Sequence, residues 1–325
     1  MLFASRLFNC RASEEETLPF FPQMYPRVSH SRTRKMPMGR FDVLKQIEQL
    51  DPERDNMRIM HLSFGYEFSW DSIRSLEIAL YRTYCVPSIS GLLDRTGEFR
   101  LRAQRRYDDT SLIVSEMCKW GYLEGRGQEA LERMNWAHAH YKISNEDLLY
   151  VLSTFIYEPI RWIDRFGWRP LCRTERLGYY YFWKEVGARM GITNIPSTYE
   201  DYERWNREFE ATHFRFADTN NRVGSSTREL FTSWFPRFLA PIVRSSIYAM
   251  LNDQMIEAFG FPRPAPGMRA MVAAMLRLRG RIVRMLPARK KAHFFADGKN
   301  RTYPRAYAIS RLGPPNLVDH ESHVD

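Results

Sequence analysis

Two expected helices carry side chains able to bind a metal ion or to stabilise negative charge. His138 lies on the expected helix Glu129–Tyr141, on an apolar face near Met134 and Tyr141. A neutral imidazole nitrogen is a common metal ligand. His140 follows two residues later and points to a different side of the helix. Spacing alone favours an ordinary structural or surface histidine, because most helical histidines bind no ligand.

A second candidate is the pair Arg106 and Thr110, which lie four residues apart on one face of the expected helix Gln104–Trp120. A guanidinium beside a hydroxyl is able to stabilise negative charge that develops on dioxygen. The pair also suits a surface arginine beside a threonine that is hydrogen-bonded to its own helix. Spacing alone favours this second interpretation.

The sequence lacks the motifs of several common enzyme classes. GxGxxG, Walker A, GxSxG and HExxH patterns are absent, which argues against nucleotide-binding, serine-hydrolase and zinc-protease mechanisms. The four cysteines, Cys10, Cys85, Cys118 and Cys172, have no CxxC or Cys/His metal spacing. We therefore expect no disulfide framework and no structural zinc, and a reducing compartment such as the cytoplasm fits best.

The hydrophobic pattern that positions these residues is helical almost throughout. Apolar residues recur every three to four positions between short breakers, and strand-like alternation is scarce. The pattern predicts one all-α domain. Its expected helices are Trp70–Thr83, Gln104–Trp120, Glu129–Tyr141, Asp147–Tyr157, Arg173–Met190, Tyr199–Phe216, Ser225–Phe235, Pro241–Phe259 and Gly267–Leu286. Pro87 and Gly91 are expected to end the helix Trp70–Thr83. Ser144 or Asn145 is expected to cap the helix Asp147–Tyr157, and Pro159 to kink that helix or to start it again.

The two ends of the chain differ from the expected domain. Residues 1–40 hold four prolines and a basic run and predict a flexible leader, and residues 41–313 form the expected domain. After Pro287 the pattern becomes irregular, and residues 314–325 are expected to be a disordered tail. Aromatic residues make up 14% of the chain, which excludes disorder for most of it.

The formal net charge of +10 points to a membrane surface more than to nucleic acid. Arginines are spread along the chain and balanced by acids, except for an excess beside apolar residues in Arg263–Arg311. The basic amphipathic helix Gly267–Leu286 suits peripheral contact with anionic lipid. The alternative, that its apolar face packs on the domain, is slightly favoured. The sequence holds no run of 18 apolar residues, so we expect no transmembrane helix.

Several runs, taken together in their order and spacing, resemble a known oxygenase domain. They are Arg82–Tyr84, Pro87–Ser90, Gln104–Thr110, Asn135–His138, Ile143–Tyr150, Glu158–Ile163, Gly187–Ile192, Tyr303–Tyr307 and Leu312–Gly313. They are similar to the domain shared by the MpaB-type oxygenases and the latex clearing (rubber) oxygenases. The resemblance covers about residues 41–313.

The resemblance implies a helical fold that encloses one b-type haem. His138 matches the family's iron ligand, and Arg106 and Thr110 match a pair on the opposite, distal side. It implies a haem-dependent oxygenase that uses dioxygen to cleave a carbon–carbon double bond in an apolar substrate, isoprenoid or polyketide-like. No nucleic-acid partner is expected.

Two departures separate the chain from the rubber-cleaving branch. Asp109 stands where that branch has a lysine, and Ser88–Ser90 stand where it has a catalytic glutamate. Polyisoprene is therefore not the expected substrate. Two other functions remain open: a haem-binding sensor or carrier without turnover, and a haem-free helical protein that docks on membranes.

Overall fold

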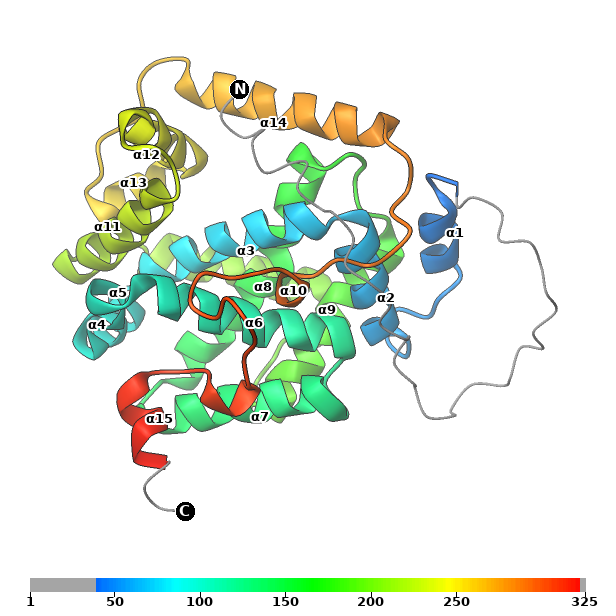
Figure 1. The fold of residues 1–325 in the computed structure, drawn as a ribbon, viewed down its shortest axis with the longest axis horizontal. Coiled ribbons are helices and arrows are strands. Elements are labelled where there is room, and N and C mark those ends of the chain that lie inside the picture. Colours follow the sequence, from blue (N-terminus) through cyan, green and yellow to red (C-terminus); the bar gives the residue numbers. More distant parts are fainter. Residues whose placement is uncertain (1–38, 322–325) are drawn as a thin grey trace. The chain divides into compact units, whose positions relative to one another are not determined.

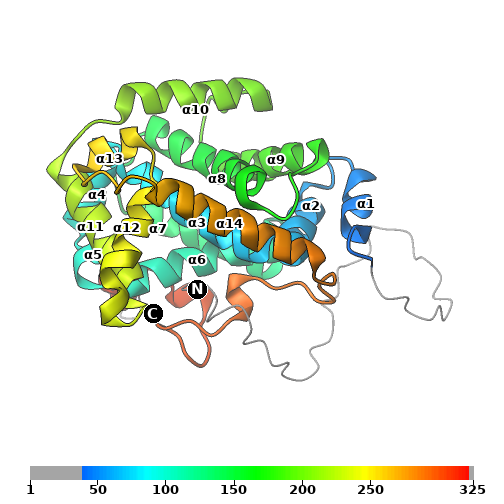
Figure 2. The same cartoon turned by 90° about the horizontal axis from the view of Figure 1, so that it is seen from above.

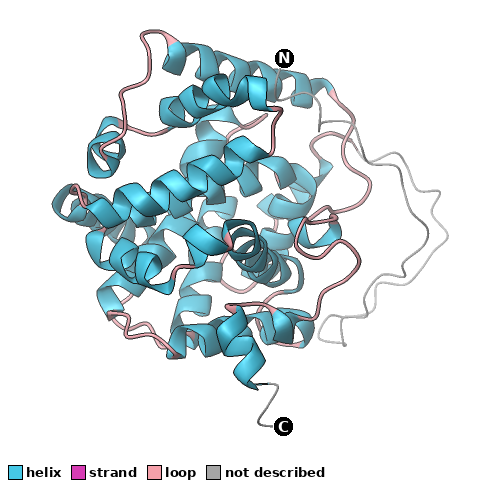
Figure 3. Ribbon diagram, turned by 60° about the vertical axis from the view of Figure 1, so that its left-hand side comes forward, coloured by secondary structure: helices cyan, strands magenta, loops and turns pink. Residues whose placement is uncertain are grey.

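The computed structural model describes residues 39–321, and within that range it consists of helices and loops without a strand (Figure 3). The all-α prediction is therefore confirmed. The first helices are α1 (Asp42–Glu48), α2 (Asn56–Leu62), the π-helix η2 (Ser63–Glu67), α3 (Ser69–Tyr84), α4 (Pro87–Thr96), α5 (Glu98–Leu101), α6 (Ala103–Trp120) and α7 (Gly125–Ala139). Next come α8 (Asn145–Phe166), α9 (Arg173–Arg189), α10 (Tyr199–His213), α11 (Asp218–Ser233), η3 (Arg237–Leu239), α12 (Ala240–Met250), α13 (Asp253–Phe259), α14 (Met268–Met285), η4 (Phe295–Asp297), η5 (Ile309–Arg311) and α15 (Pro315–Glu321).

Helices α3 and α8 pack against each other in the interior (Figures 1 and 2). The buried side chains of α8 recur every three or four residues, so one face of the helix enters the core. They include Leu149, Leu152, Ile156, Ile160 and Ile163. Helix α14 contacts α8 and α12 on the outside of the unit, and α6 contacts α7 on another side.

The α6–α7 hairpin brings the candidate residues together. Helix α6 ends at Gly121, whose positive φ of 84° suits glycine, and α7 begins four residues later. A Cβ atom on Gly127 would lie 1.8 Å from the carbonyl oxygen of Gly121, so only glycine fits there. Because so short a connection makes the helices antiparallel, Arg106 near the start of α6 comes close to His138 near the end of α7.

Helix α8 starts as expected but does not end as expected. The backbone N–H of Asp147 donates to the side-chain oxygen of Ser144 over 3.0 Å, the arrangement of an N-cap. The helix then continues through Pro159 to Phe166, so the expected restart does not occur. Pro159 is buried, and Arg82 pairs with the neighbouring Glu158 over 2.5 Å. Packing and this ion pair offset the one backbone hydrogen bond that proline removes.

Two other boundaries differ from the sequence expectation. Helix α3 ends at Tyr84, just before Pro87, as expected, but Pro87 and Gly91 themselves lie inside the next helix, α4. Proline is tolerated in the first turn of a helix, where its missing N–H costs no helical bond. The expected helix Pro241–Phe259 is divided into α12 and α13. Asn252 causes the division, since its side chain accepts a hydrogen bond from the N–H of Met255 over 2.8 Å and starts a new helix.

The expected leader of residues 1–40 lies, apart from Gly39 and Arg40, outside the described residues, as do the last four residues of the tail. After Pro287 the chain is largely irregular, but α15 forms where a disordered tail is expected. Among the described helices, none is long and apolar enough to cross a membrane.

Candidate functional site

A cavity of about 620 Å³ lies between α3, α4, α6, α7 and α8. This volume falls within the range of roughly 300–1,000 Å³ that is usual for small-molecule and cofactor sites. Most of the wall is apolar, and it includes Leu80, Leu92, Ile113, Val114, Met134, Leu148, Val151, Phe155, Trp183 and Phe231. His138, Arg106 and Thr110 all line this cavity, so the structure brings the three sequence-derived candidates into one site.

His138 has no hydrogen-bond partner among the described residues, and its Nδ1 atom is buried. Unpartnered buried polar atoms are rare in folded proteins, and each calls for an explanation. Burial, aided by the charge of Arg106, lowers the pKa of His138 to about 4. The imidazole is therefore neutral at physiological pH and keeps a nitrogen lone pair that is free to bind a metal.

His140 has a different environment. Its Nδ1 lies 2.8 Å from the carbonyl oxygen of Trp136, and its ring packs 4.7 Å from the Trp136 ring. The side chain is exposed and does not line the cavity. Of the two histidines that the sequence leaves as alternatives, only His138 faces the site.

Arg106 donates a hydrogen bond to the hydroxyl of Thr110, which also donates to the backbone carbonyl of Arg106 over 3.0 Å. The guanidinium lies 5.7 Å from the ring of Phe99. No carboxylate of the described residues forms an ion pair with Arg106. The cavity therefore holds a cation that is hydrogen-bonded to Thr110 and forms no direct ion pair with a carboxylate of the described residues.

Asp109 has a role that the sequence does not reveal. Its carboxylate accepts hydrogen bonds from the Tyr303 hydroxyl over 2.6 Å and from the Gly313 N–H over 3.1 Å. Gly313 forms part of the cavity wall. Asp109 thus anchors the C-terminal segment 303–313, whose last residue forms part of the cavity wall. No local signal could have shown this contact, because 194 residues separate Asp109 from Tyr303.

The other carboxylates in the cavity wall are also engaged. Glu98 pairs with Arg102 over 2.5 Å, and Asp147 accepts a hydrogen bond from Ser88 over 2.7 Å. Ser90 is buried and donates to the side chain of Asn220 over 2.5 Å. The position where the rubber-cleaving branch has its glutamate therefore supplies hydroxyls, and the described wall holds no carboxylate without a partner.

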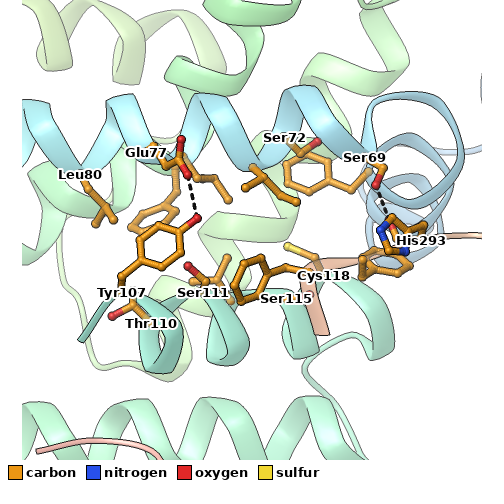
Figure 4. A pocket seen from close by; sticks show the side chains of 17 residues that line it. Ser69, Ser72, Glu77, Leu80, Tyr107, Thr110, Ser111, Ser115, Cys118 and His293 are labelled. Atoms are coloured by element: carbon orange, nitrogen blue, oxygen red, sulfur yellow. Dashed lines mark hydrogen bonds between the residues drawn. The ribbon is translucent and has the colours of Figure 1, made fainter. Parts of the chain in front are cut away.

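A second chamber of about 50 Å³ lies between α3 and α6 and is closed by residues 293–295 (Figure 4). Tyr107, Thr110 and Leu80 line both this chamber and the large cavity. The Tyr107 hydroxyl donates to Glu77 over 2.7 Å, and burial raises the pKa of Glu77. A space of this size admits molecules as small as water or dioxygen but excludes an organic substrate.

Comparison with known proteins identifies the domain that contains this site. Residues 79–285 match the family model of the catalytic domain of ER-bound oxygenase mpaB/B' and rubber oxygenase. The chain belongs to this family. It is 29% identical over 238 residues to the ER-bound oxygenase mpaB' of Penicillium brevicompactum, an alignment that covers 68% of this chain and 56% of that protein. It is 28% identical over 249 residues to the ER-bound oxygenase mpaB of Penicillium roqueforti, which covers 67% of this chain and 83% of the relative.

The chain spans about half the length of the mpaB' and mpaB proteins of Penicillium brevicompactum, 56% and 54% respectively. The matched residues 79–285 contain α6 and α7, and thus Arg106, Thr110 and His138. Within the part of the chain that the structure describes, no three His, Cys, Asp or Glu side chains gather as a metal site. A haem needs only one protein ligand on its proximal side, and a neutral, unpartnered histidine in an apolar cavity fits that requirement.

Proposed function

We propose that this chain is a haem-dependent oxygenase that cleaves a carbon–carbon double bond of an apolar small molecule. The observation that carries the proposal is the unpartnered, neutral His138 in an apolar cavity that also holds Arg106, which forms no ion pair with a described carboxylate. The names of the relatives support oxygenase chemistry in general terms.

His138 would hold the haem by one ring nitrogen, and the apolar wall would contact the flat faces and edges of the porphyrin. The bound haem supplies the iron that activates dioxygen. Histidine ligands usually donate their other ring N–H to an acceptor. Here the described residues offer none, so packing against neighbours such as Met134 and Ala137 must fix the orientation of the ring.

Arg106 and Thr110 would act on the oxygen side of the reaction. As dioxygen gains electron density, a fixed guanidinium in a poorly hydrated cavity stabilises the developing negative charge. Thr110 holds the guanidinium in place through its hydrogen bond. The overall reaction balances without another reductant: the C=C and O–O bonds break, and two C=O bonds form.

The substrate class follows from the wall of the cavity. The apolar side chains that a bound haem would leave uncovered suit an isoprenoid or polyketide-like chain. Such molecules partition into lipid, and the relatives are named ER-bound. We therefore also propose that the protein works at a membrane surface by peripheral contact.

An ultraviolet–visible absorbance spectrum of protein that is expressed with a haem precursor tests this proposal. We expect a Soret band at a stoichiometry of one haem per chain, lost in His138→Ala and kept in His140→Ala. Loss in His140→Ala with retention in His138→Ala would refute the ligand assignment, and the absence of any Soret band would leave a haem-free protein. Oxygen consumption with a terpenoid alkene then separates an oxygenase from a haem-binding sensor or carrier.

A further inference from the structure

Helix α14 presents a stripe of large apolar side chains to solvent. Its members follow one another in steps of three or four residues, which places them within an arc of about 100° on one face of a helix. They are Met271, Met275, Leu278, Ile282 and Met285, continued by Leu286 just after the helix. Leu278 is 55% exposed and Met285 is 78% exposed. Monomeric proteins rarely expose a continuous apolar row of this length unless it contacts something.

A different face of α14 packs on the domain. Val272, Leu276 and Gly280 are buried, and a Cβ atom on Gly280 would lie 2.7 Å from the backbone oxygen of Phe166. Arg279 lies on this side too, where it pairs with the buried Asp71 over 2.9 Å. The helix therefore has two apolar faces. Packing accounts for one of them and leaves the exposed stripe without a partner among the described residues.

The charge around the stripe is positive throughout. Arg277, Arg281 and Arg284 are exposed on a third face of the helix, with Arg281 nearest the stripe, and they form no ion pair with a described residue. The sequence from Met268 to Ala296 contains eight basic residues and no acidic residue. A basic face beside an apolar stripe complements a surface that is both apolar and anionic.

The neighbouring segment has the same character. Helix α12 contacts α14, and Phe238 and Ile242 on η3 and α12 are 79% and 46% exposed. This segment, Arg237–Met250, also lacks acidic residues. Figure 1 shows α14 along the upper margin of the unit, and Figure 2, which looks from above, shows it crossing the front of the view; α12 lies near its N-terminal end in both. A helix that lies on the outside of the unit in this way forms a ridge and not a groove. A ridge suits contact with a lipid surface better than binding of a peptide, which would need a groove.

We propose that the exposed face of α14 is a membrane-docking surface that selects anionic lipid. The apolar stripe lies at the boundary between headgroups and acyl chains, and Arg281, which is nearest the stripe, reaches the headgroup phosphates and carboxylates. Arg277 and Arg284 lie farther round the helix and add positive charge close to the lipid surface. Docking on this face leaves the ion pairs of α14 with the domain intact, because Arg279 and Arg269 pair on other sides of the helix.

Cosedimentation of the full chain with vesicles tests this surface. We expect binding to vesicles of phosphatidylcholine with phosphatidylserine at low salt, weaker binding to phosphatidylcholine alone, and release as salt rises. Each arginine near an anionic surface contributes about fivefold in affinity, so Arg277→Gln with Arg281→Gln should weaken binding to anionic vesicles about twenty-five-fold. Leu278→Gln with Ile282→Gln should weaken binding to both kinds of vesicle.

Matched controls are available elsewhere on the surface. Arg58→Gln with Arg100→Gln removes the same charge, and Leu101→Gln with Leu123→Gln removes comparably exposed leucines. Both control pairs should bind vesicles almost as the wild type does. Binding by the α14 variants that equals that of their controls would overturn the proposal, and so would no vesicle binding by the wild type. Sedimentation velocity without lipid gives the other decisive outcome: a dimer that Leu278→Gln with Ile282→Gln dissociates would assign the stripe to a second copy of this chain.

Discussion

At the scale of single residues, the candidate site is distinguished by polar side chains that form neither an ion pair nor a hydrogen bond with an acid. Arginines and acids elsewhere in the interior form closed ion-pair networks, such as Arg169 with Glu67 and Glu175. His138 and Arg106 have no such partner, although both face the same cavity. A folded chain that leaves a neutral imidazole and a guanidinium facing an apolar space gives up stability there, which is typical of a functional site.

The depressed pKa of His138 has a consequence for the stability of the haem-free protein. Between about pH 6.5 and pH 4 the unfolded chain takes up a proton at His138 that the folded chain does not accept. The contribution of the neutral His138 to the free energy of unfolding is therefore fully present above this pH window and is lost as the pH falls through it. We expect urea unfolding to show a drop between pH 7 and pH 4 that is smaller in His138→Gln, by at most about 3 kcal/mol. An equal drop in both proteins would contradict the burial of an uncharged imidazole.

Arg106 provides the prediction on chemistry at the residue scale. Arg106→Ala should keep the haem, because the proposed haem ligand, His138, is on α7. It should slow oxygen consumption about a hundredfold or more, as is usual when one fixed electrostatic donor is lost. Thr110→Ala should have a milder effect, since it only frees the guanidinium to move. Turnover with an alkene substrate, normalised to haem content, is the measurement. Unchanged turnover in Arg106→Ala would remove Arg106 from the mechanism.

At the scale of elements, the sequence predicts the long helices well and the connections poorly. The apolar periodicity and Gly121 place α6 within one residue at its start and at its end, because an amphipathic face and a stop signal are both local. Helix α4 depends on the tolerance of proline in a first helical turn, and the division of α12 from α13 depends on one asparagine cap. The spacing of apolar residues contains no information about either feature. Spacing placed Arg106 and Thr110 on one helical face but did not favour a site, and it was the family resemblance that singled them out together with His138. The packed structure adds that the three side chains line one cavity, whereas His140 lies outside it.

The contact between Asp109 and the segment 303–313 joins two distant parts of the chain beside the cavity, and a substitution of Asp109 tests its role. Asp109→Ala removes the acceptor for Tyr303 and Gly313 and should destabilise the fold by about 2–3 kcal/mol, the usual cost of losing hydrogen bonds to a charged group. Hydrogen exchange in residues 300–314 should rise more than exchange in α8. Glu129→Ala, which removes an exposed carboxylate on α7, is the control and should leave both quantities nearly unchanged. Exchange that rises equally throughout the chain would mean that Asp109 supports the whole domain and not this segment.

At the scale of the whole molecule, one compact helical unit combines an internal cavity with an exposed lipid-compatible face. The cavity lies within the hydrophobic interior and is a cost to stability while it is empty, because its walls lose packing contacts. A ligand that fills it and bonds to His138 should therefore stabilise the entire fold. This effect links the residue that binds the ligand to the global unfolding transition.

Thermal unfolding measures that link without any assay of turnover. A ligand that binds only the folded chain stabilises it by about 2.7 kcal/mol at a free concentration one hundred times its Kd. For a chain of this size that corresponds to a rise in Tm of roughly 5 °C when haem is added. His140→Ala should show the same rise, since its ring packs on Trp136 outside the cavity, whereas His138→Ala should show little or none. A full rise in His138→Ala would mean that haem binds elsewhere on the chain, because the cavity would then stabilise the fold without its one neutral, unpartnered imidazole.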